Sequence, residues 1–305
     1  MKTSASPTSP RRAEEQMGPH THASHIARLC LDRMMALRAA SAKRRGQRVF
    51  LSSLSSEDRA LLGRNQIFRD RHKGKRCFVI GNGPSLRTQN LLPLANELTF
   101  VMNAFWKNPV VEKWQPTYYF FADGLYFDGS EPMRIFFSNL RSVVHASTFF
   151  LPIFGKHVVR SMSLLSPDMT YYVAFHGSLS DELSHLPDFT GIVPGVQSVS
   201  EFAIMAAMYM GCSPIYLLGL DHDWLSHSGM DRHFYEGATV DHPQAEQNLG
   251  KYSYRVLMES QLRLWYGYES ILRVANTAGI RIVNATRGGF LDVFEREDYD
   301  SLIRD

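Results

Sequence analysis

The side chains best suited to chemistry lie between residues 221 and 236. Asp221 and Asp223 flank a histidine, and His233 and Glu236 follow further along the chain. Imidazole titrates near neutral pH, so His233, or a carboxylate such as Glu236 or Asp221, could exchange a proton with a substrate hydroxyl. The two aspartates could instead supply hard oxygen ligands to Mg²⁺ or Mn²⁺ bound to a nucleotide. A solvated polar loop without a chemical role is the simpler alternative.

A glycine-rich loop after the apolar run 77–80 is the first candidate for binding a phosphate. Its residues are Gly81, Asn82, Gly83, Pro84, Ser85 and Leu86. Glycines let the backbone approach a ligand closely, and a following helix would offer its N-terminal N–H groups to an anion. Proline suits a first helical turn, and the serine could cap the helix or contact a phosphate oxygen.

Two familiar nucleotide-binding patterns are absent from this loop. A dinucleotide fingerprint needs a third glycine where Leu86 stands, and the chain contains no GxxxxGK[ST] sequence. Ordinary NAD binding and ordinary P-loop ATP hydrolysis are therefore disfavoured.

A second helix N-terminus offers a similar anion site. Gln197, Ser198 and Ser200 precede the stretch 201–210, which is apolar on nearly all faces and so predicts a buried helix. The N–H groups and hydroxyls at its start could hold an anion. An ordinary serine N-cap on a core helix is the alternative.

The elements that must position these residues follow from the alternation of apolar runs and helical patterns after residue 76. This alternation predicts a Rossmann-like α/β fold, with a mostly parallel sheet and helices on both faces. Strands are expected at 77–80, 98–102, 117–122, 148–151, 171–174, 213–218 and 280–283, and the clearest helices at 200–210 and 249–278.

A polar residue follows five of the expected strands: Asn82, Asn103, Asp123, Asp221 and Asn284. Ligands of open parallel sheets bind outside the carboxyl ends of the strands, so such residues can share a site. Turns also favour Asn and Asp, and one such residue alone means little. We expect at least three of the five to line one site.

The net charge of the 305-residue chain is only +3, and the basic excess lies within the first 85 residues. A global field for nucleic acid is therefore excluded, and we expect no nucleic-acid partner. Residues 1–20 predict a disordered tail, 21–74 a helical N-terminal extension, and 75–305 the α/β domain.

Several features favour a cytoplasmic protein. The three cysteines, Cys30, Cys77 and Cys212, form no paired motif, and no apolar run approaches the ~18 residues of a membrane span. Residues 23–45 predict a basic amphipathic helix, which could lie on the inner face of a membrane. Packing of that helix on the domain or on a partner is the alternative.

Residues 77–86 (CFVIGNGPSL), the strands ending at Asn103 and Asp123, and the unit 198–221 together resemble two related groups of proteins. One is the 6-hydroxymethylpterin diphosphokinase-like (MptE-like) domain, which also occurs in flagellin-modifying glycosyltransferases. The other is the small bacterial sialyltransferases that use CMP-activated nonulosonic acids. The resemblance runs from about residue 76 to 294.

The resemblance to the sialyltransferases implies particular nucleotide contacts. It assigns the cytidine nucleotide to Asn82 and Asn103 and a further polar contact to Asp123. The serine before the core helix corresponds to Ser198 or Ser200.

The same resemblance implies an inverting reaction without a metal, with a late histidine as base and tyrosine hydroxyls on the leaving phosphate. His233 and Tyr235 lie in the corresponding segment, with Glu236 as the other candidate base. The Asp-His-Asp triplet departs from the sialyltransferase pattern, which leaves a metal at Asp221 and Asp223 as a candidate.

The leading hypothesis is a glycosyltransferase-like enzyme that uses a nucleotide-activated sugar, CMP-linked by resemblance, to modify a surface glycan or flagellin. The first alternative is a Mg²⁺-dependent pyrophosphokinase of the pterin type, with Asp221 and Asp223 as metal ligands. The second is a nucleotide-binding module without catalysis.

Overall fold

The structure is a computed structural model that describes Met34 and residues 41–42, 45–223, 225–226, 233–235 and 253–304. The chain divides into two compact units, Met1–Ser53 and Leu54–Asp305. In the first unit residues 45–53 are helical, whereas the expected tail 1–20 and most of the basic helix 23–45 lie outside the described residues. Among the described residues, no helix has the length and apolar character needed to cross a membrane.

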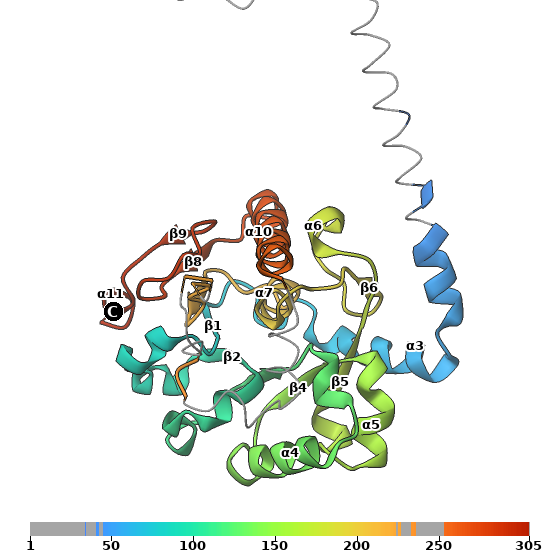
Figure 1. The fold of residues 1–305 in the computed structure, drawn as a ribbon, viewed down its shortest axis with the longest axis horizontal. Helices are drawn as coiled ribbons and strands as arrows, with labels where there is room; N and C mark the ends of the chain where they lie inside the picture. Colours follow the sequence, from blue (N-terminus) through green and yellow to red (C-terminus); the bar gives the residue numbers. More distant parts are fainter. Residues whose placement is uncertain are drawn as a thin grey trace, which may run out of the picture. The chain divides into compact units, whose positions relative to one another are not determined.

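The second unit is built on one parallel sheet, which confirms the expected Rossmann-like α/β fold (Figure 1). Its strands are β1 (Cys77–Ile80), β2 (Leu98–Met102), β3 (Tyr118–Phe120), β4 (Thr148–Pro152), β5 (Thr170–Phe175), β6 (Ile192–Val193), β7 (Ile215–Leu218), β8 (Ile282–Asn284) and β9 (Glu295–Arg296). Their order is β6-β5-β4-β3-β2-β1-β7-β8-β9, and every neighbouring pair is parallel.

The strand order reverses between β1 and β7. The chain winds from β1 outward to β6 in one direction, and then returns to β7 on the other side of β1. Ile80 pairs in register with Val101 of β2 and Leu218 of β7, so the three central strands end at one level. Their loops therefore leave the same edge of the sheet, beside the crevice that such a reversal opens.

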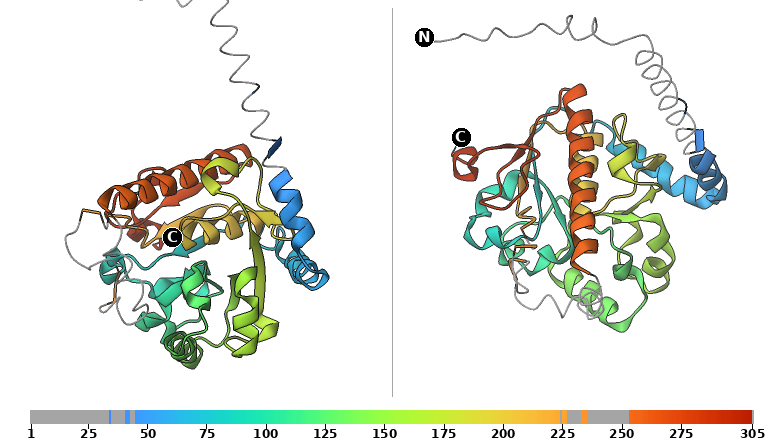
Figure 2. Two further views of the ribbon diagram at one scale, coloured as in Figure 1. Left: turned by 45° about the vertical axis from the view of Figure 1, so that its right-hand side comes forward. Right: turned by 45° about the horizontal axis from the view of Figure 1, so that its top comes forward.

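Helices cover both faces of the sheet (Figures 1 and 2). The α-helices are α3 (Ser56–Gly63), α4 (Glu131–Val143), α5 (Lys156–Ser161), α6 (Leu179–Glu182), α7 (Val199–Tyr209), α10 (Tyr254–Thr277) and α11 (Tyr299–Leu302). Short 3₁₀ helices are Arg64–Phe68, Pro84–Thr88, Leu92–Asn96, Asn103–Lys107, Pro109–Glu112, Gly124–Phe127, Ile153–Gly155 and Pro167–Met169.

The alternation of side chains along β1 divides the core into two layers. Cys77 and Val79 face the cluster that contains α7 and α10, whereas Phe78 and Ile80 face the cluster that contains α4. Helix α7 lies between the sheet and α10, and all of its residues from Ser200 to Tyr209 are buried (Figure 2). This sandwiched position explains a helix that is apolar on nearly every face, because each large side chain contributes roughly 1.5–3 kcal/mol by burial.

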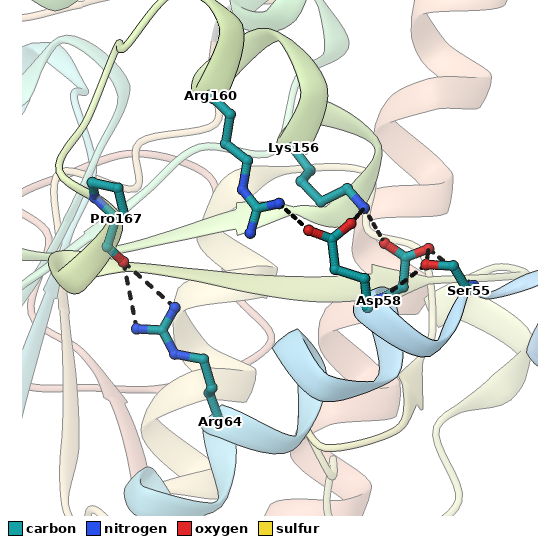
Figure 3. Close-up of polar contacts among 7 residues, drawn as sticks. Ser55, Asp58, Arg64, Lys156, Arg160 and Pro167 are labelled. Carbon is teal, nitrogen blue, oxygen red and sulfur yellow. Dashed lines mark hydrogen bonds and ion pairs between the residues drawn. The ribbon is translucent and has the colours of Figure 1, made fainter.

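Helix α3 belongs to the compact unit of the sheet and is attached to α5 by charged side chains (Figure 3). Ser55 and Asp58 form a capping box at its start. Lys156 Nζ lies 2.6 Å from Asp58 Oδ1 and 2.9 Å from Glu57 Oε2, and Arg160 also pairs with Glu57. Exposed pairs of this kind contribute up to about 1 kcal/mol each.

The two-residue strands β6 and β9 were not expected, because Ile192 and Val193 of β6 are too short an apolar run and Glu295 and Arg296 of β9 are both charged. The expected strand 213–218 begins only at Ile215, and the expected helix 249–278 is seen from Tyr254 onward, since residues 249–252 lie outside the described residues. The glycine loop leads into the 3₁₀ helix Pro84–Thr88 and not into an α-helix.

Candidate functional site

A cleft of about 490 Å³ opens at the carboxyl edge of the sheet, past the ends of β1, β2, β3 and β7. It brings together eleven residues that the sequence indicated: Gly81, Asn82, Gly83, Asn103, Asp123, Gln197, Ser198, Ser200, Asp221, Asp223 and His233. A second cavity of about 380 Å³ shares Asn103, Asp123 and Ser198 with the first and extends it toward β3. Side chains from four strand ends thus meet the start of α7 in one elongated cleft.

Asn82 and Asn103 each present an unsatisfied group at this cleft. The Asn82 amide donates to the Met102 carbonyl at 3.0 Å, while the side-chain oxygens of both asparagines are buried without a partner among the described residues. Asn103 also has a φ of 50°, in the left-handed region. Such strain and unpaired polar atoms persist where the surroundings enforce them, typically at binding sites.

Asp123 and Asn284 have different surroundings although both follow strands. Asp123 lines the cleft, and its carboxylate accepts a hydrogen bond from the Leu125 amide at 2.9 Å, which caps the 3₁₀ helix that starts at Gly124. The Asn284 side chain is buried and fully engaged, since it donates to Leu291 O at 2.8 Å and accepts from Thr286 N at 3.0 Å. Asn284 therefore holds its own turn and does not line the cleft.

The glycine loop binds a carboxylate of the protein itself, that of Asp221. Asp221 Oδ1 accepts from the Ser85 amide at 2.9 Å, and Asp221 Oδ2 accepts from the Ser85 hydroxyl at 2.8 Å. A Cβ at Gly83 would lie 1.7 Å from Asp221 Oδ2, so only glycine permits this approach. The amide and hydroxyl of Ser85, which were expected to bind a phosphate, are thus already bound to Asp221. Neither Pro84 nor Ser85 lines the cleft.

Asp221 and Asp223 do not form a metal centre with other described residues. Among these residues, no group of three or more His, Cys, Asp or Glu side chains is placed to hold a metal ion. Both oxygens of Asp221 are engaged by Ser85, and burial raises the pKa of this carboxyl against the effect of those hydrogen bonds. The described residues alone therefore supply no complete ligand set for a Mg²⁺ or Mn²⁺ ion.

A second carboxylate occupies the start of α7. Glu201 Oε2 accepts from the amides of Gln197 at 2.6 Å and Ser198 at 2.9 Å, in a capping box. The side chain is fully buried, and burial raises the pKa of Glu201 to about 8, while the two amides act in the opposite direction. Ser198 and Ser200, together with Gln197, are the polar residues that line the cleft at this helix start.

Behind the cleft the two serines belong to a buried chain of hydrogen bonds. Ser198 Oγ lies 2.7 Å from Ser200 Oγ, which lies 2.6 Å from Tyr268 Oη, which lies 2.7 Å from His222 Nε2. His222 has a φ of 50°, and burial lowers its pKa to about 4. Burial also raises the pKa of Tyr268 well above its ordinary value.

Sequence reasoning did not identify Tyr268, which lies in the middle of α10. One local signal was its neighbour Gly267, because glycine is unfavourable inside a helix. A Cβ at Gly267 would lie 1.8 Å from Glu201 Oε1, so this glycine allows α10 to close over the start of α7.

The segment 233–235 is anchored to the glycine loop. The Phe234 amide donates to Asn82 O at 2.8 Å, and Arg87 donates to the carbonyls of His233 and Phe234, each at 3.0 Å. The rings of His233 and Tyr235 stack with their centres 5.0 Å apart. His233 lines the cleft, whereas Tyr235 does not, and the other candidate base, Glu236, lies outside the described residues.

These features define a Rossmann-like protein with a polar cleft at the topological switch point of its sheet. No protein-family model matches the chain, and no curated protein matches it in sequence. The resemblance to the MptE-like domain therefore stays an expectation.

Two solved structures are similar to the chain. The MAf glycosyltransferase from Magnetospirillum magneticum AMB-1 aligns with a TM-score of 0.45 and 14% identity over 80% of this chain and 38% of that chain. The sialyltransferase CstII from Campylobacter jejuni, in complex with the substrate analogue CMP-3FNeuAc, aligns with a TM-score of 0.45 and 15% identity over 73% of this chain and 86% of that chain. The chain thus spans 38% of the length of the first structure.

Proposed function

We propose that the cleft binds a nucleotide-activated sugar and that the protein is a glycosyltransferase-like enzyme, with a CMP-linked sugar as the first candidate donor. The observation that carries the proposal is the convergence of polar groups from β1, β2, β3, β7, α7 and the segment 233–235 on one cleft. Open parallel sheets bind nucleotides at such a switch point.

The extended shape of the cleft suits a donor with two parts. The side-chain oxygens of Asn82 and Asn103 lack partners among the described residues and can accept hydrogen bonds from amino or hydroxyl groups of a nucleoside. The cavity that continues past Asp123 toward β3 provides room for a second group. A nucleoside and a sugar joined by a phosphate would fill both parts.

The phosphate of this donor is expected at the start of α7. Because Ser85 already binds the carboxylate of Asp221, the glycine loop shapes the cleft without supplying its serine to a ligand. Ser198 and Ser200 line the cleft, and the Ser198 hydroxyl can hold a phosphate oxygen. Proton uptake by Glu201 removes a negative charge that would repel the phosphate there.

The reaction that this arrangement supports is direct displacement at the anomeric carbon. The acceptor oxygen forms a bond to that carbon while the bond from the carbon to the phosphate oxygen breaks. The electron pair of the broken bond leaves with the nucleotide phosphate, and His233 takes the proton of the acceptor hydroxyl. Glu236 is the other candidate for this base.

The acceptor class and the location extend the proposal. A surface glycan or flagellin is the proposed acceptor, in line with the resemblance described above. We place the protein in the cytoplasm, with peripheral contact at the inner face of the membrane through the basic segment 23–45.

A thermal-shift panel of CMP, UDP, GDP and ADP, each with and without Mg²⁺ or Mn²⁺, tests the proposal. CMP should stabilise the protein without added metal, and a CMP-linked sugar should then be hydrolysed or transferred. Stabilisation only by adenine nucleotides with Mg²⁺ would favour the pyrophosphokinase. Binding of CMP without turnover of any CMP-sugar would favour a binding module, and no shift with any nucleotide would refute a nucleotide site.

A further inference from the structure

The buried chain from Ser198 to His222 joins three elements that are far apart in the sequence. Ser198 and Ser200 start α7, Tyr268 lies on α10, and His222 follows β7. Its three links measure 2.7, 2.6 and 2.7 Å, all within the range of good O–H···O and O–H···N hydrogen bonds. Both ends of the chain reach the cleft, because Ser198 and His222 line it, while Tyr268 lies entirely in the core.

The protonation of His222 decides which group donates in each hydrogen bond of this chain. Each hydroxyl has a single proton to donate, and the described residues offer the buried hydroxyls of Tyr268 and Ser200 no other acceptor, so all three hydroxyls point the same way. If His222 carries a proton on Nε2, it donates to Tyr268, Tyr268 donates to Ser200, and Ser200 donates to Ser198. The Ser198 proton is then left to point into the cleft. Without a proton on Nε2 the order reverses, and Ser198 offers only lone pairs to a ligand.

We propose that Tyr268 and His222 are positioning residues, which direct the hydroxyl proton of Ser198 into the cleft as a hydrogen-bond donor to the phosphate of the bound nucleotide. This inference rests on the function proposed above, because the phosphate is the group that requires a donor. Tyr268 does not reach the ligand, and both residues act on the phosphate through the two serines.

The surrounding backbone explains why the hydroxyls need such support. Glu201 already binds the amides of Gln197 and Ser198, which lie just before the first turn of α7. The serine hydroxyls are the side-chain donors beside that turn, and a free hydroxyl rotates to suit its neighbours. A chain of aligned donors removes that freedom and strengthens the last hydrogen bond by mutual polarisation.

The loop after β7 is also held so that the imidazole cannot turn away. His222 has a φ of 50°, its carbonyl accepts from Gln261 Nε2 at 3.3 Å, and its ring contacts that of Trp265, 6.0 Å away. Helix α10 thus supports both His222 and the tyrosine that links it to α7.

The test compares the affinities of CMP and cytidine for the intact protein and for Tyr268→Phe by titration calorimetry. The variant keeps the ring and loses the hydroxyl, so CMP binding should weaken about tenfold, the usual effect of one hydrogen bond to a charged group, while cytidine binding stays within about twofold. Tyr299→Phe is the matched control, because it also removes a buried tyrosine hydroxyl, which donates to Asn90 O at 2.8 Å away from the cleft. It should change neither affinity.

A double-mutant cycle with Ser198→Ala separates positioning from a general loss of structure. If Tyr268 acts through Ser198, Tyr268→Phe should not weaken CMP binding further once the serine is gone. Equal losses for CMP and cytidine, or additive losses in the cycle, would overturn the inference. Should Tyr268→Phe fail to fold, His222→Asn, whose side chain tolerates a positive φ, takes its place in the same cycle.

Nitrogen-15 NMR of the imidazole gives a readout that does not need turnover. With CMP bound, His222 should carry a proton on Nε2, and a proton on Nδ1 alone would overturn the inference. If the intact protein binds neither CMP nor cytidine, the proposed function fails separately, and the same variants are then titrated with inorganic phosphate. Unchanged phosphate affinity in Tyr268→Phe would refute the positioning role as well.

Discussion

Replacement of Glu201 by glutamine should change how the stability of the protein depends on pH. The carboxyl is fully buried at the start of α7, and burial raises its pKa from the ordinary 4.5 to about 8. The folded protein then holds a proton that the unfolded chain releases. Its contribution to stability is complete below pH 4.5 and is lost as the pH rises to about 8.

The magnitude follows from the width of that pH window. At about 1.4 kcal/mol for each pH unit, the free energy of unfolding falls by on the order of 5 kcal/mol between the two pKa values of Glu201. For a unit the size of Leu54–Asp305, about 2 °C in Tm corresponds to 1 kcal/mol, so the full effect approaches ~10 °C.

The assay is urea unfolding of the natural protein and of Glu201→Gln at intervals from pH 5 to pH 9. Glutamine keeps an oxygen that can accept from the amides of Gln197 and Ser198, and it has no proton to lose in this range. The variant should therefore gain stability over the natural protein as the pH rises. The NH₂ group of the new glutamine lies beside Gly267 without a partner, which lowers the free energy of unfolding by the same amount at every pH. The test is therefore how the difference between variant and natural protein changes with pH.

Glu131→Gln is the matched control, because Glu131 is an exposed carboxylate paired with Arg134, and that pairing lowers its pKa. The difference in the free energy of unfolding between this variant and the natural protein should not change with pH above pH 5. A flat difference for Glu201→Gln as well would refute the reasoning. It would mean that the two amides and the helix N-terminus keep Glu201 ionised in spite of its burial.

Three further substitutions test the cleft. Asn103→Gly removes a side chain at a φ of 50°, so thermal unfolding should show unchanged or slightly higher stability, whereas calorimetry should show CMP affinity reduced about tenfold. Gly83→Ala places a Cβ 1.7 Å from Asp221 Oδ2 and 2.7 Å from Gly219 O, so it should destabilise the protein by ~2 kcal/mol or more in urea unfolding and weaken CMP binding. His233→Gln should leave CMP affinity unchanged and lower the rate of sugar transfer by about 10²–10⁴-fold. An unchanged rate would mean that another residue is the base.

The positions of the strand ends could be predicted because they depend on short-range patterns. Each central strand is a short apolar run followed by a polar residue, and parallel pairing then places these residues at one edge. Asn82, Asn103, Asp123 and Asp221 lie in the cleft for this reason. Asn284 has the same sequence pattern but is the last residue of β8, which is separated from the switch point by β7. The pattern identifies the edge of the sheet but not the distance of a strand from the crevice.

The partners of the two expected anion sites could not be predicted, because they are set by tertiary packing. Ser85 meets Asp221 only when β7 pairs beside β1, and the sequence separates these residues by 136 positions. Tyr268 reaches Ser200 across 68 positions, and only because Gly267 lets α10 approach α7 closely. The serine N-cap at Ser198 was among the expectations, but the burial of its partner Glu201 depends on the helix that covers it.

The two internal carboxylates also decide where an anionic ligand can bind. At the glycine loop, Asp221 receives both donors of Ser85, so a phosphate there would have to displace a carboxylate held by two hydrogen bonds. At the start of α7, Glu201 uses only backbone amides, and burial favours its neutral form up to about pH 8. The Ser198 hydroxyl beside it is the donor proposed for the phosphate. A phosphate therefore meets less repulsion and more available donors at α7, which favours this end of the cleft for the leaving nucleotide.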